Sequence, residues 1–292
     1  MLDLSHIPNS QQDIKIFYAN GSAWQTWQKP RKCNYVYIMC VGGGGGGASG
    51  RVSSVYTTGG ASGGISRALY NTQFIPDTLY VQVGLGGLGG PASAGTGTNG
   101  SPGTRSWVGL QPTVIPQNLI QGSGAAVAAG GITTGTNAAG ETAINQTIVT
   151  FLTLSNFIGT AGVTSVGSGA ISIPPNITPF TSQLLTQGGG GGGVGPTDGA
   201  SILSTTISPL IAGGLTSSSG NAGNGANGIT SYKPFYSTGG AGGGNSQSGG
   251  NGGDGGDGGI GSGGGGGGSC VSGFLGGKGG KGGDGLVIII SF

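Results

Sequence analysis

A three-residue glycine repeat constrains this chain more than any other feature. Two nine-residue segments, 252–260 and 276–284, place glycine at two of every three positions. That period matches an extended helix of the polyproline II type, which has three residues per turn and rises about 3.1 Å per residue. Two of the three faces of such a helix would carry only hydrogen, so neighbouring segments could hydrogen-bond backbone to backbone. The repeat therefore predicts packed polyglycine II rods.

Two other interpretations of the repeat were weighed. Collagen needs one glycine in three and abundant proline elsewhere, whereas these segments contain no proline. A flexible linker is the simpler alternative, since glycine-rich chains often serve that purpose. A linker, however, has no reason to end in an apolar run such as 286–292, which follows the second segment directly.

The glycine content makes a folded state expensive. Glycine occupies 74 of 292 positions, and each glycine in a regular element costs roughly 0.5–1 kcal/mol relative to alanine. Summed over the chain, that cost could exceed the ~5–15 kcal/mol of net stability of a typical domain. A core remains feasible because 34% of residues are apolar and the net charge is only +2, unlike most disordered chains. Close backbone packing, association with other subunits, or both must offset the cost.

Short strands are the other clear signal, and helix patterns are nearly absent. The segments 35–41 (YVYIMCV) and 286–292 (LVIIISF) are apolar at almost every position, as expected of strands covered on both faces. They bracket the glycine-rich part of the chain, so we predict that they are neighbours in one sheet. Further candidates are 79–83 and 147–154 and, more weakly, 11–18, 65–70 and 171–173.

These patterns predict a mostly β fold. We expect a jelly-roll-like antiparallel sandwich with long glycine-rich excursions, partly in polyglycine II rods. The expected organisation is an N-terminal arm over 1–22 and a glycine-rich β domain over 23–292. The more ordinary composition at about 123–207 leaves room for an inserted lobe.

Catalytic and cofactor chemistry find little support. The segment 84–89 fits G-x-G-x-x-G, but a dinucleotide site requires a helix after the motif, and the following GPASAGTGTNGSPG cannot form one. The single histidine, His6, lies in a polar N-terminal stretch unsuited to a catalytic triad. Three dispersed cysteines, Cys33, Cys40 and Cys270, cannot supply a zinc site with it. We therefore expect no catalytic residue, no cofactor and no enzyme activity.

Two aspartates in the repeat, Asp254 and Asp257, raise the question of calcium. Calcium sites use six to eight oxygen ligands and denser carboxylates than this. On a threefold rod both aspartates lie on one edge, as do Lys278 and Lys281 on theirs. We favour exposed edges or Asp/Lys pairing between rods over metal binding.

The sequence gives little information about binding partners or cellular location. Lys29, Arg31 and Lys32 form the one local basic cluster, too small to indicate nucleic-acid binding. The N-terminus lacks the pattern of a signal peptide, and no run of 18 apolar residues predicts membrane insertion. An odd cysteine count argues against a disulfide framework. Synthesis in a cytoplasm is the simplest expectation.

Aromatic residues between glycine-rich segments are the candidate contact residues for a receptor or partner. They are Tyr232, Lys233, Phe235 and Tyr236, in the sequence YKPFY. Loops often carry recognition, and tyrosine offers a large amphipathic surface at little entropy cost. The alternative is an aromatic plug that packs beneath the loops.

The order of features along the chain resembles glycine-rich domains of bacteriophage tail-fibre and related virion proteins. The resemblance covers about half of the chain, and the part from about 123 to 207 departs from it. It is carried by Trp24-x-x-Trp27-x-Lys29-Pro30, strand 35–41 with the glycine run from Gly42, LYVQVGLGGLGG at 79–90, GTRSW at 103–107, and GGDG at 282–285 before LVIIISF.

The resemblance implies a structural protein of a virus particle: a tail or head fibre component, or a capsid-surface protein. Such proteins are commonly trimers, so the implied partners are copies of this chain and other virion proteins, with a host surface glycan or protein as a further one. The implied location is the virion, after synthesis in a host cytoplasm. The alternative function is a receptor- or carbohydrate-binding adhesin module that acts through loop aromatics.

Overall fold

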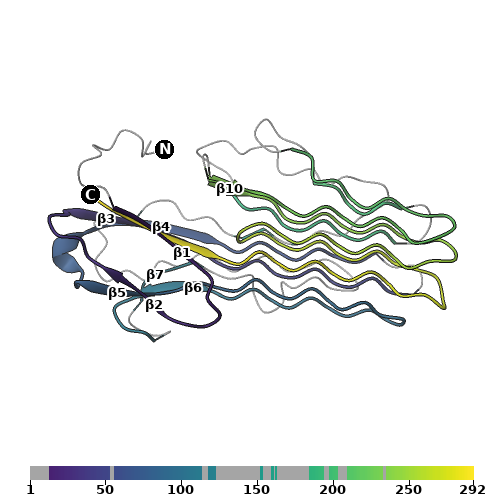
Figure 1. The fold of residues 1–292 in the computed structure, drawn as a ribbon, viewed down its shortest axis with the longest axis horizontal. Helices are drawn as coiled ribbons and strands as arrows, with labels where there is room; N and C mark the ends of the chain where they lie inside the picture. The colour runs from purple at the N-terminus through teal and green to yellow at the C-terminus, as the bar shows by residue number, and fades with distance from the viewer. Residues whose placement is uncertain are drawn as a thin grey trace.

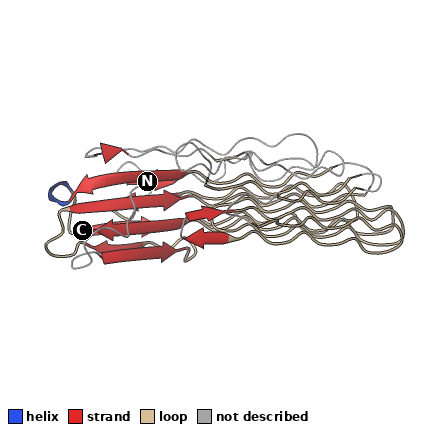
Figure 2. Ribbon diagram, turned by 90° about the horizontal axis from the view of Figure 1, so that it is seen from above, coloured by secondary structure: helices blue, strands red, loops and turns tan. Residues whose placement is uncertain are grey.

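The structure is a computed structural model of the chain. The residues it describes are 13–52, 56–113, 118–122, 152–153, 159–160, 162, 184–193, 197–202, 209–232 and 235–292. β-Sheets occupy one end of an elongated molecule, and extended glycine-rich segments run from the sheets to the other end (Figures 1 and 2).

The larger sheet contains the two strongest strands of the sequence. All its pairings are antiparallel, and β11 lies between β1 and β3, with Leu286 opposite Val41 and Ile290 opposite Tyr37. This confirms the prediction that 286–292 and 35–41 are sheet neighbours. The strand order is β1 (Asp13–Tyr18), β11 (Leu286–Ser291), β3 (Tyr35–Val41), β4 (Ile65–Asn71) and β8 (Leu152–Thr153).

A second antiparallel sheet faces the first one. It has the order β2 (Gln25–Gln28), β5 (Thr78–Gln82), β6 (Ser106–Gly109) and β7 (Asn118–Gly122). A separate hairpin joins β9 (Thr230–Tyr232) to β10 (Phe235–Ser237). Among the described residues the helical element is a 3-10 turn, Thr72–Phe74. No helix in this part of the chain has the length and apolar character of a membrane span.

The core fills both sides of the larger sheet. One cluster lies between the two sheets and joins Val36, Ile38 and Val287 to Trp27 and Leu79. A second cluster covers the opposite face, where Met39, Val41, Ile65 and Leu286 pack with Leu185. β3 and β11 are therefore buried on both faces, as their apolar sequences require. The predicted mostly β sandwich is confirmed.

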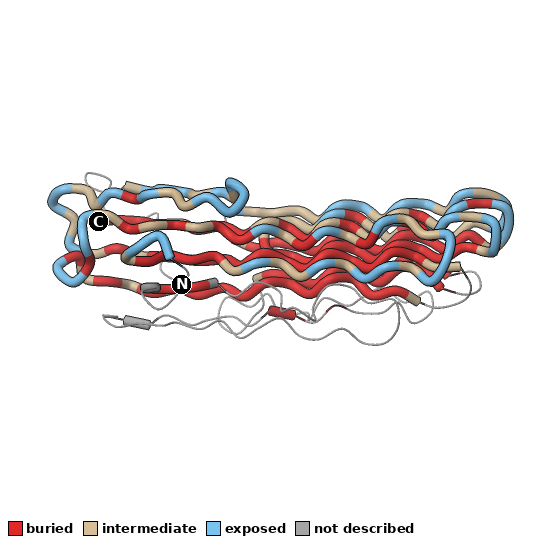
Figure 3. The backbone as a smooth tube through the Cα atoms, turned by 90° about the horizontal axis from the view of Figure 1, so that it is seen from below, coloured by how far each residue is buried: buried red, intermediate tan, exposed pale blue. Residues whose placement is uncertain are grey.

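Most strands continue at the rod end of the sheets as an extended segment, here called a rod; these strands are β3, β4, β5, β6, β9, β10 and β11. The rods pack side by side, and the innermost are almost entirely buried (Figure 3). The chain reverses at turns far from the sheets, among them 91–97, 246–250 and 270–275 (Figure 1). The rods are 42–50, 57–64, 84–91, 98–105, 185–193, 197–202, 211–217, 222–229, 238–246, 251–260, 261–270 and 276–285.

The rod at 42–50 shows the hydrogen-bond rule of the bundle. Its successive amides donate to different neighbours in rotation, so that every third amide reaches the same one. Three residues per turn produce this pattern, because successive amides then point about 120° apart. The amide series that start at Gly42, Gly43 and Gly44 donate to 58–64, 98–104 and 277–283, respectively.

The rod at 261–270 occupies the centre of the bundle. Every residue in it is buried, and a Cβ on Gly264 would come closer than 3.0 Å to the carbonyl oxygen of Gly280. Only glycine permits this backbone spacing. Backbone hydrogen bonds join the rod to six neighbours: 42–50, 57–64, 185–193, 238–246, 251–260 and 276–285.

The two repeats that predicted rods do form rods, with backbone partners along their length. Gly255 and Gly258 donate to the carbonyls of Lys278 and Lys281, so the two repeats lie against each other. This result confirms ordered rods over a linker.

Other predicted elements differ in extent. Residues 13–18 of the expected N-terminal arm form β1, and the described parts of 123–207 include the rods at 185–193 and 197–202. Of the predicted strand at 147–154, β8 is the described part, and 171–173 lies outside the described residues.

Candidate functional site

The candidate contact residues lie on the β9–β10 hairpin, close to the junction of sheets and rods. Tyr232 is 46% exposed, whereas Tyr236 is buried and Phe235 packs against the second core cluster. The ring centroids of Tyr232 and Phe235 are 6.4 Å apart. Lys233 lies outside the described residues. Within the described part of this group, Tyr232 is the side chain presented to solvent.

A second exposed tyrosine lies next to it. The hydroxyls of Tyr18 and Tyr232 are 3.5 Å apart, and this hydrogen bond, with partial burial, raises the pKa of Tyr232 to about 12. The Tyr232 hydroxyl therefore remains neutral at physiological pH and can donate or accept a hydrogen bond.

Tyr18 belongs to an exposed apolar row on β1. Ile14 and Ile16 are 49% and 42% exposed, and Tyr18 is 53% exposed. Alternate residues of a strand lie on one face, so these three side chains form one row. We call these three residues and Tyr232 the β1 surface. Sequence reasoning did not single it out, although the alternation D-I-K-I-F-Y in a strand candidate was the available signal.

The polar residues of the repeats have a structural role. Asp254 Oδ1 and Asp257 Oδ1 accept hydrogen bonds of 2.7 Å from the backbone amides of Lys278 and Lys281 on the next rod. The amides of the same aspartates donate to Asn224 and Asn227 of a third rod at 2.8 Å. The pairing between rods thus uses the amides of the two lysines, while the ammonium group of Lys281 pairs with Asp284 of its own rod at 2.8 Å.

We call this series of side-chain oxygens that accept hydrogen bonds from backbone amides of the next rod the capping ladder. In the outermost rods, one amide in three points away from the bundle, and a side-chain oxygen of the neighbouring rod accepts its hydrogen bond. Three further hydrogen bonds of the same kind extend the ladder. In each, a side-chain Oδ1 accepts from a backbone amide: Asn221 from Asn251, Asn251 from Leu275, and Asp284 from Gly86. Among the described residues, no group of three or more His, Cys, Asp or Glu side chains could hold a metal ion.

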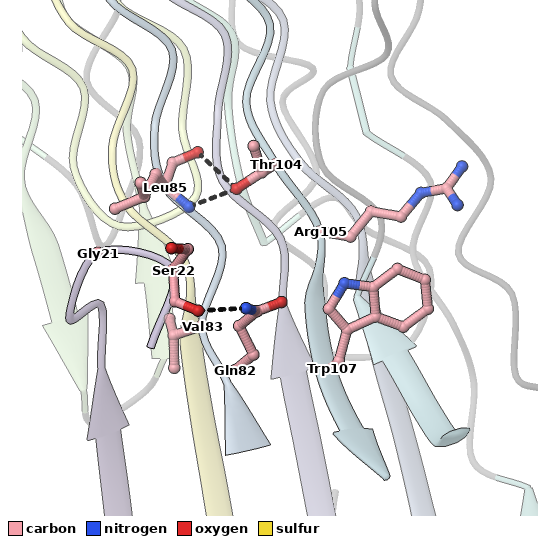
Figure 4. Close-up of a pocket in the computed structure, with 8 residues that line it drawn as sticks. All are labelled: Gly21, Ser22, Gln82, Val83, Leu85, Thr104, Arg105 and Trp107. Carbon is pink, nitrogen blue, oxygen red and sulfur yellow. Dashed lines mark hydrogen bonds between the residues drawn. The ribbon is translucent and has the colours of Figure 1, made fainter. Parts of the chain in front are cut away.

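A cavity of about 280 Å³ lies where two rods leave the second sheet (Figure 4). The guanidinium carbon of Arg105 is 5.8 Å from the centroid of the Trp107 ring. Other lining groups bond each other: Gln82 Nε2 donates to the carbonyl of Ser22, and Leu85 donates its amide to Thr104 Oγ1. Several hydrogen-bonding groups that line the cavity thus already have partners within the protein.

The motif that resembled a dinucleotide fingerprint forms part of a rod. The amides of Gly84 and Gly86 donate to Ser106 Oγ and Asp284 Oδ1, and that of Gly87 donates to Gly44 O. The backbone amides that would bind a phosphate in a dinucleotide site thus donate hydrogen bonds to neighbouring segments of the bundle.

The basic cluster also contributes to the fold. Lys29 Nζ lies 2.9 Å from Asp77 Oδ1 and donates to two backbone carbonyls around the 3-10 turn. Arg31 and Lys32 are exposed. Lys29 therefore fixes the loop that joins β4 to β5.

The chain matches a known protein family. A family model described as a glycine-rich domain matches residues 19–291, nearly the whole chain. No curated protein matches the chain. The match includes every described strand except β1 and all the described rods, so the chain belongs to the glycine-rich domain family.

Proposed function

We propose that this chain is a structural protein of a virus particle, either a tail or head fibre component or a capsid-surface protein, which assembles as a homo-oligomer. The observation that carries the proposal is the rod bundle, in which one rod bonds to six neighbours. Three-directional hydrogen bonding resists bending in every direction. A molecule of this kind suits a spike or spacer that must keep its shape.

The two ends of the molecule differ in a way that fits this role. Strands and apolar clusters gather at one end, and turns close the rods at the other (Figures 1 and 3). Sheets with exposed apolar residues are suited to attachment, and turns on stiff supports are suited to presentation.

A non-catalytic role is part of the proposal. Asp254, Asp257 and Asp284 accept backbone hydrogen bonds in the capping ladder, and Asp77 pairs with Lys29. These four carboxylates therefore have structural partners.

The test is to locate the chain in purified particles of the virus that encodes it. An antibody against the turn at 246–250 should label a fibre or the capsid surface in immunogold electron microscopy, and mass spectrometry should find the chain in particles. Its absence from particles, with abundant chain in the infected cell, would reject the proposal.

A receptor- or glycan-binding adhesin module is the second candidate, and the exposed Tyr18–Tyr232 pair favours it. Tyr232→Ala should then abolish binding of the purified chain to host cells. Phe74→Ala is the matched control, because Phe74 is 60% exposed at a different place. Equal binding by both variants would reject a role for Tyr232 in recognition.

A further inference from the structure

Among the described residues, β1 lies at one edge of the larger sheet. It has six residues, and its one described partner strand is β11 (Figure 2). Apart from that ladder, the backbone of residues 14–17 makes no hydrogen bond to another described segment. An open edge with unpaired N–H and C=O groups is a template for another strand.

The face beside this edge is apolar. Ile14, Ile16 and Tyr18 of the β1 surface are between 42% and 53% exposed, and Tyr232 extends the patch. The patch continues into the second core cluster, because Ile16 lies opposite Ile288 on β11. Contiguous apolar exposure beside an open edge is characteristic of an interaction surface.

We propose that the β1 surface binds the β1 surface of a second copy of this chain. The two strands pair antiparallel about a twofold axis and join the two larger sheets into one. Identical patches then face each other, as closed twofold association requires. The inference rests on the self-association within the proposed function, but not on location in a virion.

Charge selects the register of this pairing. A twofold axis perpendicular to the sheet must pass midway between one residue and its own copy, because residues paired across two strands share a face. An axis at Lys15 would place two lysines directly opposite, which is unfavourable. An axis at Ile14 would leave Tyr18 without a partner within β1. An axis at Ile16 places Ile16 opposite its own copy and Ile14 opposite Tyr18, so the exposed row becomes a continuous contact.

With the axis at Ile16, no two charged side chains of like sign within β1 lie directly opposite each other. Lys15 Nζ lies 3.5 Å from Asp13 Oδ1 within one copy, and Lys15 then faces Phe17 of the other copy. The resemblance to virion proteins implies a trimer, whereas this pairing produces a dimer or another even-numbered assembly. The two expectations are separable by experiment.

A crosslink tests the register in the full-length chain. In a Cys33→Ser background, Ile16→Cys places two thiols opposite each other, at the Cα separation of about 4.4–6.8 Å that a disulfide requires. Cys40 and Cys270 are buried and stay in place. Mild oxidation should convert most of this variant to a covalent dimer. The control Lys15→Cys should remain largely monomeric on a denaturing gel, because its thiols would be diagonal neighbours whose Cα atoms lie about 7–8 Å apart.

A second measurement does not depend on thiols. Ile16→Glu places two carboxylates on the axis and should shift the chain from dimer to monomer in sedimentation at micromolar concentration, with unchanged circular dichroism. Leu88→Glu is the matched control, since Leu88 is 67% exposed on a rod, and it should remain dimeric. A monomer or trimer for the unaltered chain, or equal crosslinking of both cysteine variants, would overturn the inference. Detection of the chain in particles would leave the proposed role as a virion structural protein standing in either case.

Discussion

The carboxylate of Asp254 accepts a 2.7 Å hydrogen bond from the backbone amide of Lys278 on the neighbouring rod. The contact explains why the repeat keeps one non-glycine residue in three. Glycine faces allow close packing inside the bundle, and the third position supplies an oxygen for an outward amide of the next rod. One short motif thus satisfies both packing and hydrogen bonding.

The acceptor role of Asp254 predicts a specific ranking of substitutions. Asp254→Asn keeps an oxygen at the same place and should change the free energy of unfolding little. Asp254→Leu leaves the Lys278 amide to water or unpaired and should cost about 1 kcal/mol. Urea denaturation measures both, and Lys278→Leu serves as the control because its amide is unaffected. Equal stability of Asp254→Leu and the unaltered chain would contradict the capping ladder.

Glycine positions between rods should tolerate no side chain. A Cβ at Gly255 or Gly279 would come closer than 3.0 Å to the carbonyl oxygens of Gly265 or Gly47. Valine at either position should cost more than about 3 kcal/mol, because backbone cannot yield as a side chain does. Lys281→Ala loses only an exposed ion pair, worth about 0–1 kcal/mol. Comparable losses for valine and alanine variants, measured by thermal unfolding, would refute close packing of these rods.

Removal of residues 286–292 should abolish folding. β11 lies between β1 and β3, and Leu286, Val287 and Ile289 are fully buried. The truncation exposes both core clusters, removes the described partner of β1 and opens one edge of β3. Solubility and circular dichroism of the truncated chain provide the measurement. A soluble and fully folded truncation would show that the sheets do not depend on this strand.

The three cysteines of the native protein should differ in how fast a thiol reagent labels them. Burial raises the pKa of Cys40 well above its ordinary value and also raises that of Cys270. The thiolate is the reactive form, and both side chains are buried, whereas Cys33 is partly exposed. A maleimide at neutral pH should therefore modify Cys33 first, as read by mass spectrometry of peptides. Rapid labelling of Cys40 would contradict its place in the core.

The sequence predicted the rods and the central strand pair because both have strong local signals. The G-G-x period of 252–260 and the apolar run at 286–292 each point to one kind of structure. The arrangement of the rods was not predictable, since Gly255 could donate to any neighbouring backbone. Which rods are neighbours depends on the order in which the strands join the sheets.

The β1 surface was harder to find than the rods for a different reason. Whether Ile14 and Ile16 pack inward or face solvent depends on what covers β11, which no local pattern encodes. Tyr236 illustrates the converse, because its sequence left both a contact residue and a packed aromatic plug open, and the residue is buried. Burial of an aromatic residue follows from the tertiary contacts of its strand.

Amide hydrogen exchange across 261–270 tests the central claim most directly. In a bundle where this rod is buried and bonded to six neighbours, its amides should open only with global unfolding and exchange far more slowly than those of the turn at 246–250. Mass spectrometry of peptides from the two segments makes the comparison within one sample. Slow exchange at 261–270 is the predicted result, and exchange at the rate of an unfolded chain would contradict the rod bundle.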